Sequence, residues 1–366
     1  MSDAGVTQWR ALPTTIAPEE LAPWCSRIPV PVAVTGATGF VGSHLLEALL
    51  DGGVRPRLLV RDPSRLPERA WLQAEVVRGS LDDRDAVAGL VAGCGSVIHV
   101  AGLVRGVRAA QFDRANRVGT ESLVSAMREH APAARLVHLS SLAAVGPSAD
   151  PMGKWPDDPP NPVSIYGRSK LAGETAVRGH GGSWVILRPP AIYGPRDTDI
   201  LQFFRLAARG VVLIPAGERF LTVAFVTDVV RAVLAALAGA GDGQALNLGE
   251  PVPQTLRTMV GVLAKTGGVA ARCVSVPPFL ARVTGLVGDL LQSLGMRGVA
   301  MTTDKAREMV ARHWSARTEN SLTALGLPGF VPFETGARAT WAWYRDRGWV
   351  PRAKIRPLHV PESDRG

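Results

Sequence analysis

The chain has 366 residues, 46% of them hydrophobic and 20% charged, which is typical of a soluble globular protein with a sizeable core. Its formal charge of +9 comes almost entirely from arginine. No run of basic residues, zinc-ligand spacing or aromatic-basic RNA motif accompanies this charge, so a nucleic-acid binder is disfavoured. Three scattered cysteines, no signal-peptide pattern and no apolar run of membrane-spanning length together favour a cytoplasmic protein.

The first regular stretch is a β-branched run from Val30 to Thr35, which predicts a buried strand. Glycines follow at 36, 39 and 42, and the apolar periodicity from Val41 to Leu50 predicts a helix. Strand, glycine turn and helix in this order are typical of dinucleotide binding. Gly36 would allow the tight turn, Gly39 the approach of a pyrophosphate, and Gly42 close packing of the helix.

Further along, strands and helices alternate, which predicts a parallel sheet with helices on both faces. The second strand, Pro56 to Val60, is followed directly by Arg61. An acid at the end of this strand would bind the ribose 2′-hydroxyl of NAD, but Val60 holds that place. An arginine beside it can pair with the 2′-phosphate of NADP, with Ser64 and Arg65 nearby. The sequence therefore favours NADP(H) over NAD(H).

A predicted strand from Arg135 ends in two hydroxyls, the second of which is Ser141, and a predicted helix carries Tyr166 and Lys170. Residues four apart lie on one helical face, so this pair can reach the same ligand. A phenol of pKa about 10 is a poor acid–base group at neutral pH unless a nearby ammonium stabilises its phenolate. Lys170 can supply that charge and hold the nicotinamide ribose, while Ser141 holds the substrate oxygen. We expect these three residues to be catalytic.

Together these motifs resemble the extended short-chain dehydrogenase/reductases, the NAD-dependent epimerase/dehydratase family. The resemblance runs from about residue 29 to 350. It includes the GxxGxxG spacing, the YxxxK pair, the turn from Arg188 to Pro195 and the segment from Phe225 to Ala232. Residues 340–349 are similar to the end of sterol-dehydrogenase-like members. The nearest branch would be that of dihydroflavonol reductases and 3β-hydroxysteroid dehydrogenases.

The resemblance implies an α/β fold: a Rossmann-type, doubly wound parallel sheet with a smaller, discontinuous C-terminal substrate-binding lobe. The NADP-binding domain would cover residues 29–195, with 223–250 returning to it. The lobe would be assembled from 196–222 and 251–350, followed by a tail over 351–366. Residues 1–28, which contain three prolines, form an irregular N-terminal extension that packs on the domain or stays loose.

The family pattern also implies a set of cofactor contacts. Pro189 and Ile192 would border the nicotinamide. Ser80 stands where many members have an acid that meets the adenine, so this contact is weaker or passes to Asp82. No metal site is expected. The expected cofactor-binding residues are Gly36, Thr38, Gly39, Phe40, Val41, Gly42, Arg61, Ser80, Leu81, Ala101, Gly102, Tyr166, Lys170, Pro189 and Ile192.

Several other polar residues have plainer explanations. His99 lies in an apolar run and is expected to be a hydrogen-bonded core histidine, and Tyr193 a packing residue. Thr227 and Asp228 are expected to cap a helix. Asn116 is either a helix cap or part of the site, and the sequence leaves both possibilities open.

The predicted function is NADP(H)-dependent reduction of a ketone, or oxidation of the secondary alcohol, in an apolar small molecule. The alternative is a nucleotide-sugar epimerase or dehydratase of the same family. Those enzymes usually have a tyrosine at the position of Val145, and dehydratases an acid where Leu142 follows Ser141. A protein that only senses the cofactor would typically lack Tyr166 or Lys170. The substrate, the direction of reaction and the oligomeric state, including a homodimer, stay open.

A stretch near the C-terminus bears on the substrate and on membranes. From Pro278 to Leu294, apolar residues recur on one predicted helical face: Leu280, Val283, Val287, Leu290, Leu291 and Leu294, widened by Phe279 and Leu286. Such a stripe usually covers a core. It is wider than a small lobe needs, so it could also line an apolar cleft or contact a membrane surface. We expect part of this face to contact an apolar substrate.

Overall fold

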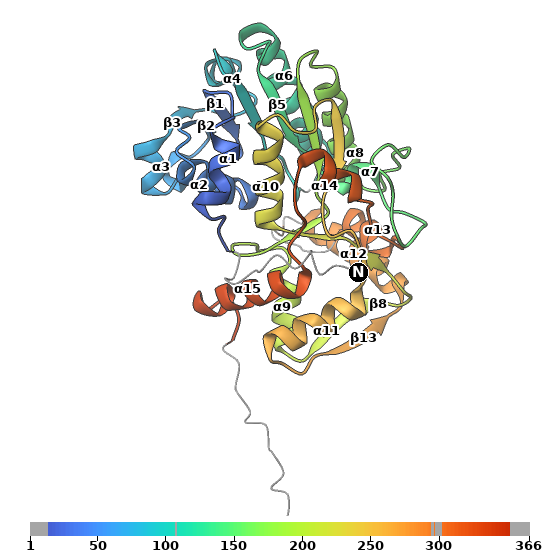
Figure 1. The fold of residues 1–366 in the computed structure, drawn as a ribbon. Helices are drawn as coiled ribbons and strands as arrows, with labels where there is room; N and C mark the ends of the chain where they lie inside the picture. Colours follow the sequence, from blue (N-terminus) through green and yellow to red (C-terminus); the bar gives the residue numbers. More distant parts are fainter. Residues whose placement is uncertain (1–13, 107, 294–295, 297–301, 352–366) are drawn as a thin grey trace, which may run out of the picture.

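The computed structural model describes residues 14–106, 108–293, 296 and 302–351, and it is organised around one parallel sheet (Figure 1). The sheet order is β11-β6-β5-β4-β1-β2-β3, with every strand parallel to its neighbours. The strands are β1 (Val32–Thr35), β2 (Pro56–Val60), β3 (Glu75–Arg78), β4 (Ser96–His99), β5 (Arg135–Leu139), β6 (Trp184–Arg188) and β11 (Gln244–Asn247). The predicted doubly wound sheet is therefore confirmed. The chain runs outward from β1 to β3 and then crosses back to β4, and ligands of such sheets bind at this reversal.

The first strand begins two residues later than predicted. Val30 is exposed, and Pro31 has no N–H to give to a neighbouring strand, so the ladder starts at Val32. The Pro31 carbonyl still accepts hydrogen bonds from the N–H groups of Gly95 and Ser96. The apolar alternation alone cannot locate this boundary, because Val30 continues the β-branched run.

Helices cover both faces of the sheet. On one face α2 and α10 pack against each other, and on the other α4, α6 and α8 form a second layer. The elements of this half are α2 (Phe40–Asp51), a 3₁₀ turn (Pro63–Arg65), α3 (Glu68–Gln73), α4 (Arg84–Val91), α5 (Ala109–Phe112), a π-helical turn (Asp113–Val118), α6 (Gly119–His130), α7 (Leu142–Val145), α8 (Ile165–Arg178) and α10 (Val226–Leu237). α10 is buried along its whole length.

The described part of the N-terminal extension packs on the domain, but the expectation that it is irregular is wrong for residues 18–25, which form a helix. Its helix α1 (Pro18–Cys25) contacts α2 and α10. Leu21 is fully buried in the core on this face, and Glu20 forms an ion pair with Arg231 of α10. Residues 1–13 lie outside the described part of the chain.

A second apolar core lies below the sheet in Figure 1, where C-terminal segments gather. Phe204, Trp341 and Tyr344 are buried at its centre, and the Phe204 ring lies 5.0 Å and 5.1 Å from the other two. The elements of this half are β7 (Ala191–Tyr193), α9 (Leu201–Ala208), β8 (Val211–Pro215), β9 (Phe220–Leu221), β10 (Val223–Phe225), β12 (Gln254–Thr255), α11 (Leu256–Gly267), β13 (Arg272–Val276), α12 (Pro278–Ser293), α13 (Thr303–Val310) and α15 (Phe333–Asp346). α14 (Glu319–Leu325) lies between α13 and α15 in the chain but packs on α10 and β11 of the first core.

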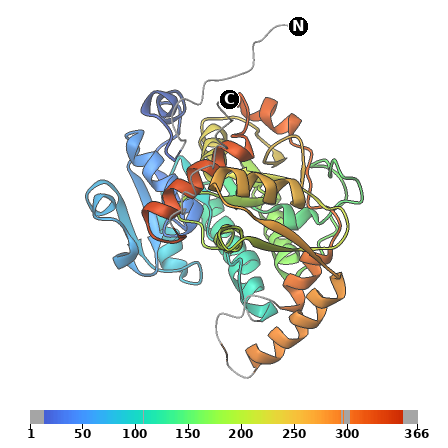
Figure 2. The ribbon, with the colours of Figure 1, turned by 90° about the horizontal axis from the view of Figure 1, so that it is seen from below.

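Helix α12 packs on α13 at the edge of the molecule (Figure 2). The helix itself matches the predicted one, but its apolar face does not cover the lobe. Phe279, Leu280, Val283, Leu286 and Val287 are between 41% and 63% exposed, so the expected core role of this face is wrong for these five residues. Leu294 lies outside the described residues. None of the helices that the structure describes is long and apolar enough to cross a bilayer.

Candidate active site

The glycine turn between β1 and α2 has the shape of a pyrophosphate site. Gly36 has a φ of +82°, and a Cβ there would lie 2.5 Å from the Ala101 nitrogen. A Cβ at Gly42 would overlap the Gly36 carbonyl oxygen, so α2 sits directly against the turn. The helix begins at Phe40, after Gly39. The first N–H groups of a helix have no partner within it, so they can bind an anion at this point.

Two arginines lie at the end of β2, beside the glycine turn. Arg61 is exposed, and Arg65 donates a hydrogen bond to the carbonyl of Thr38 in that turn (3.4 Å). Asp62, the residue after Arg61, is an acid in the same turn. Its carboxylate accepts from both the N–H and the hydroxyl of Ser64 (3.2 Å and 2.7 Å), and these bonds lower its pKa. Asp62 is thus engaged within its own turn, while Arg61 faces solvent.

The predicted adenine side is built around Ser80 and Asp82. The Ser80 hydroxyl accepts from the Asp82 N–H (3.3 Å), and the Asp82 carboxylate pairs with Arg114 (2.9 Å). Leu81 lies against Gly119 at the start of α6. Asp82 is therefore held by an arginine at the surface, and Ser80 keeps its hydroxyl proton available for donation.

The end of β4 connects the glycine turn to α8. Ala101 packs against Gly36, as described above. A Cβ on the next residue, Gly102, would lie 3.0 Å from the Asn116 amide oxygen and 3.7 Å from the Lys170 ammonium. The structure therefore brings the predicted cofactor residues 36, 101 and 102 and Lys170 together at the carboxyl ends of the strands.

Ser141, Tyr166 and Lys170 come from adjacent elements. Ser141 follows β5 and caps α7, its hydroxyl oxygen accepting from the Ala143 N–H (3.1 Å). Tyr166 is the second residue of α8, and Lys170 follows one turn later. Lys170 is 4% exposed, and its ammonium donates to the carbonyl of Leu139 at the end of β5 (2.7 Å). A hydroxyl, a phenol and an ammonium thus meet at the carboxyl end of β5.

The protonation of this group follows from its burial. Desolvation raises the pKa of the Tyr166 hydroxyl to about 12, against a hydrogen bond with Ser141 that acts in the opposite direction. Desolvation lowers the pKa of Lys170 to about 8, while the nearby Glu174 carboxylate acts to raise it. Near neutral pH the phenol therefore carries its proton and the lysine its charge, so the site is set to donate a proton.

The turn after β6 lies beside Ser141. The carbonyl of Pro189 accepts from the N–H of Leu142 (2.8 Å), the residue that follows Ser141. Ile192 is a partly buried residue of β7, which pairs with β10 in parallel. Of the two residues expected beside the nicotinamide, Pro189 therefore bonds the residue next to Ser141, and Ile192 follows three residues later.

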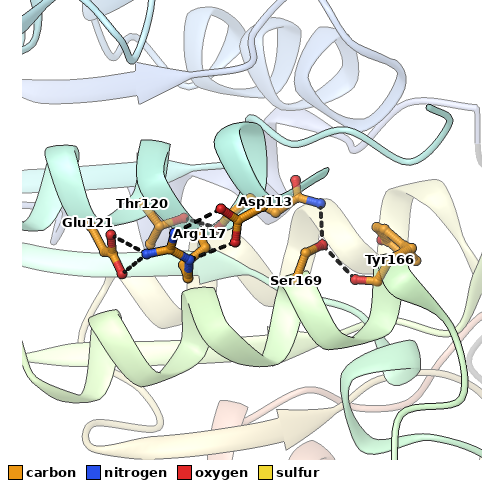
Figure 3. A network of polar contacts seen from close by, with 7 residues as sticks. Asp113, Arg117, Thr120, Glu121, Tyr166 and Ser169 are labelled. Atoms are coloured by element: carbon orange, nitrogen blue, oxygen red, sulfur yellow. Dashed lines mark hydrogen bonds and ion pairs between the residues drawn. The ribbon is translucent and has the colours of Figure 1, made fainter. Parts of the chain in front are cut away.

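Asn116 belongs to the support of the site. It is buried in the π-helical turn, and its side chain exchanges hydrogen bonds with both backbone groups of Leu103 (2.7 Å and 3.0 Å). Its amide also donates to Ser169 (2.9 Å), whose hydroxyl donates to the Tyr166 carbonyl (2.7 Å), as Figure 3 shows for Ser169 and Tyr166. Asn116 thus fixes α8 relative to the loop after β4. The sequence alone could not decide between this role and a helix cap.

A buried ion pair, Glu174 with Arg188, lies next to Lys170, and no motif in the sequence predicted it. Glu174, 1% exposed, lies one turn after Lys170 on α8. Its carboxylate binds Arg188 at the end of β6 (2.9 Å and 2.6 Å) and accepts from the Ser140 hydroxyl (2.6 Å). Glu174 therefore joins α8 to the ends of two strands. Its spacing of four residues after Lys170 is the only sequence signal for this role.

The C-terminal half also reaches the site. On α13, the Asp304 carboxylate accepts from the Ile165 N–H (2.8 Å), directly before Tyr166. Asp199, which precedes α9, pairs with Arg105 in the loop after β4. No motif had marked residues 303–310 as close to the site, because this contact depends on how the lobe folds back.

The plainer explanations were mostly correct. His99 is fully buried and hydrogen-bonded through both ring nitrogens, to Thr35 (2.7 Å) and Thr120 (2.9 Å). Tyr193 is buried against Phe225 and Phe333.

The predicted helix cap at Thr227 and Asp228 is wrong. α10 begins at Val226, without a side-chain cap. The Asp228 carboxylate instead accepts from Arg231 (3.0 Å) and from the N–H of Val331 (2.7 Å), so it links α10 to the segment before α15. Thr227 and Asp228 are the second and third residues of α10, so neither stands at the N-cap position, which Phe225 occupies.

Residues 32–249 match the model of the NAD dependent epimerase/dehydratase family. The chain belongs to this family, whose members bind NAD or NADP, and it is an oxidoreductase with a Rossmann fold. It is similar to the ceramide reductase of Caulobacter vibrioides, with 36% identity over 324 residues that cover 88% of this chain and 96% of the relative. It is also similar to the 4-hydroxy-2-methyl-3-oxo-4-farnesyl-3,4-dihydroquinoline-1-oxide ketoreductase of Stigmatella aurantiaca, with 29% identity over 84% of this chain and 94% of the relative.

Among solved structures, the chain is similar to MoeE5 in complex with UDP-glucuronic acid and NAD. The two share 26% sequence identity at a TM-score of 0.68, over 87% of this chain and 100% of MoeE5. A protein solved with a sugar nucleotide and NAD thus has the same fold as this chain.

Proposed function

We propose that the protein is an NADP(H)-dependent oxidoreductase that reduces a ketone, or oxidises the secondary alcohol, of an apolar small molecule. One observation carries this proposal: Tyr166 and buried Lys170 lie one turn apart on α8, next to Ser141 at the end of β5. The glycine turn and Gly102 lie on the same side of the sheet. A dinucleotide seated on the turn would therefore extend toward these three side chains.

In this proposal the bound cofactor supplies the hydride, and the protein supplies the proton and the positioning. Ser141 would donate a hydrogen bond to the carbonyl oxygen of the substrate, exchanging its bond to the Tyr166 hydroxyl for this one while its own oxygen still accepts from the Ala143 N–H. Tyr166 donates its proton to the same oxygen. Lys170 stabilises the resulting phenolate with its ammonium charge and holds the ribose.

The preference for NADP(H) rests on the end of β2. Arg61 and Arg65 place two positive charges beside the glycine turn, and Arg65 is anchored to Thr38. A guanidinium pairs with a phosphate through charge-assisted hydrogen bonds. The acid at this point, Asp62, is engaged with Ser64 and would have to give up those bonds to bind a ribose hydroxyl.

The apolar substrate is supported by the two relatives above, one named for ceramide and one for a farnesylated quinoline. Val145 and Leu142, in place of a tyrosine and an acid, also argue against a sugar substrate. The alternative is a nucleotide-sugar epimerase or dehydratase, and the similarity to MoeE5, solved with UDP-glucuronic acid and NAD, favours it.

A substrate panel separates the two functions. The protein is incubated with NADPH or NADH and either long-chain ketones or UDP-hexoses, and cofactor oxidation is followed by absorbance. We expect NADPH oxidation with one or more ketones and none with the sugars. Conversion of a UDP-hexose without net cofactor oxidation would contradict the proposal and establish the alternative.

A further inference from the structure

Helix α12 buries small residues and exposes large apolar ones, the opposite of an ordinary surface helix. It packs on α13, and the residues buried on this side are small: Gly285 and Gly288 are buried, and Ala281, one turn before Gly285, is partly buried. A Cβ at Gly285 would lie only 3.0 Å from the Cβ of Ala306 and from backbone atoms of Thr302 and Thr303. The small residues thus let the two helices approach closely.

The opposite face of α12 holds its large apolar side chains. Phe279, Leu280, Val283, Leu286 and Val287 are all exposed, between 41% and 63%. Surface helices normally direct such residues toward the core. A contiguous exposed apolar patch usually marks a binding surface. We call these five residues the α12 apolar face. It lies at the edge of the molecule (Figure 2).

The strand that leads into α12 shows the same reversal. β8 and β13 pair in parallel, with Arg272 opposite Val211 and Val274 opposite Leu213. These four residues alternate along the strands and are all exposed, whereas Val212 and Ile214 between them are buried. One face of this two-stranded sheet therefore offers three apolar side chains and an arginine to solvent.

The charge of this region points to an anionic partner. Residues 256–313 contain eight basic and three acidic residues, an excess of five within a chain of formal charge +9. All three acids are engaged: Asp289 accepts from the Thr303 N–H (3.2 Å), Asp304 from the Ile165 N–H (2.8 Å), and Glu308 pairs with Lys305 (2.8 Å). These acids are already included in the count, and Lys265 pairs with Glu334 outside the stretch (2.9 Å), so the excess is at most four positive charges.

We propose that the α12 apolar face binds the surface of an anionic lipid bilayer. Apolar side chains that enter the headgroup boundary, next to basic residues that meet anionic headgroups, are the features of interfacial helices. A second copy of the chain fits less well, because a two-fold interface would set the same cationic region against itself. α12 is too short and too interrupted by glycine to span the bilayer, so the contact is peripheral.

The docked face would lie one helix away from the active site. α13 packs on α12 and holds the backbone before Tyr166 through Asp304. Resting on the proposed function, this placement would let an apolar ketone pass from the bilayer to Tyr166 without crossing bulk water. The docking itself does not depend on the reaction.

Vesicle co-sedimentation of the full chain tests the proposal. The probes are phosphatidylcholine vesicles with and without phosphatidylglycerol. We expect sedimentation only with the anionic vesicles and weaker binding as salt is raised. The double variant Phe279→Gln/Leu286→Gln should bind at least about tenfold more weakly, because two apolar anchors are lost. Leu72→Gln, at an apolar residue of α3 that is 74% exposed, is the matched control and should bind like the wild type.

Every other result overturns the proposal. No wild-type sedimentation with anionic vesicles would do so, as would equal losses in the double variant and the control. A double variant that unfolds by circular dichroism would show that these side chains support the core. A wild-type dimer without lipid that Leu286→Gln dissociates would assign the face to a second copy. Because sedimentation is read without turnover, these outcomes are distinct from failure of the proposed reaction.

Discussion

At the residue scale, the chemistry of the site depends on side chains whose surroundings set their charge. Lys170 is buried yet stays charged near neutral pH, since desolvation lowers its pKa only to about 8 and the nearby Glu174 carboxylate opposes the fall. Tyr166 keeps its proton because desolvation raises its pKa to about 12. Binding of the cofactor and substrate would have to bring the ammonium and the phenol into closer electrostatic contact for the phenolate to form.

The preference for NADP(H) can be tested at Arg61. The variant Arg61→Ala should weaken NADPH binding by roughly 1.5–3 kcal/mol, the range of a charge-assisted hydrogen bond, and leave NADH binding nearly unchanged. Isothermal titration of both cofactors measures this difference. Arg84→Ala, at another exposed arginine, should change neither affinity. Tighter binding of NADH than NADPH by the wild type would refute the assignment.

The sequence predicted one group of residues that the structure brings to the candidate site, those for which a motif fixes both residue type and spacing, and their roles stay predictions. Gly36, Gly42, Tyr166 and Lys170 fall into this group, because each spacing follows from helix or turn geometry. Asn116 could not be decided, since its partners Leu103 and Ser169 are distant in the chain and are brought close only by the fold.

At the scale of elements, α8 is the helix that the rest of the site holds in place. The Glu174–Arg188 pair ties it to β6, Ser140 ties it to β5, and Asn116 ties it to the loop after β4. These bonds are made by Glu174 and Ser169 of α8, not by Tyr166 or Lys170. The position of Tyr166 and Lys170 is thus set by buried polar contacts along most of the helix.

Breaking the buried pair should be costly. Glu174→Gln leaves the Arg188 guanidinium, whose side chain is 5% exposed, without a counter-charge. We expect a loss of about 3–5 kcal/mol in the free energy of unfolding, measured with denaturant. The control is Glu47→Gln at the half-exposed pair with Arg196, which should cost about 1 kcal/mol or less. Equal effects of the two variants would contradict this account of α8.

Helix α12 shows what periodicity leaves open at this scale. The apolar spacing predicted the helix correctly, because the repeat of 3.6 residues is a local property. It could not predict which face is covered. The side with Gly285 is what packs on α13, since a glycine allows a close approach that larger residues prevent.

At the scale of the whole molecule, the sheet order and the two apolar cores arise from contacts far apart in the chain. The alternation of strands and helices predicted a doubly wound sheet, but it could not show that α1 packs on α10 through Glu20 and Arg231. Nor could it show that α13 returns to Tyr166. The domain boundaries expected for the lobe, 196–222 and 251–350, stay a prediction.

Two stacked, buried histidines make a contribution to the free energy of unfolding that is lost in mild acid, whereas the raised pKa values of Asp197, Asp228 and Glu250 act in the opposite direction. Burial lowers the pKa of His99 to about 3 and that of His138 well below 6.5. Below pH 6.5 these histidines bind protons in the unfolded chain but not in the folded one. Their contribution to the free energy of unfolding is therefore lost as pH falls. Each histidine contributes a loss of about 1.4 kcal/mol between pH 7.5 and 5.5.

Denaturant unfolding at the two pH values measures this loss. His138 has no hydrogen-bond partner in the described structure, so His138→Leu should fold and show a pH-dependent loss smaller by about 1.4 kcal/mol than the wild type. His130→Gln, at a side chain that is 36% exposed, should leave the loss unchanged. Equal changes in the free energy of unfolding for His138→Leu and the wild type between the two pH values would contradict this account of His138.

The central claim is that Tyr166 donates the proton in a hydride-transfer reaction, and the variant Tyr166→Phe tests it most directly. The measurement is ketone-dependent NADPH oxidation, with NADPH binding followed in parallel by titration. We predict that turnover falls by about 10²–10⁴-fold, as expected for the loss of general acid catalysis, while NADPH still binds because the glycine turn, Arg61 and Lys170 are untouched. Turnover near that of the wild type would contradict the claim.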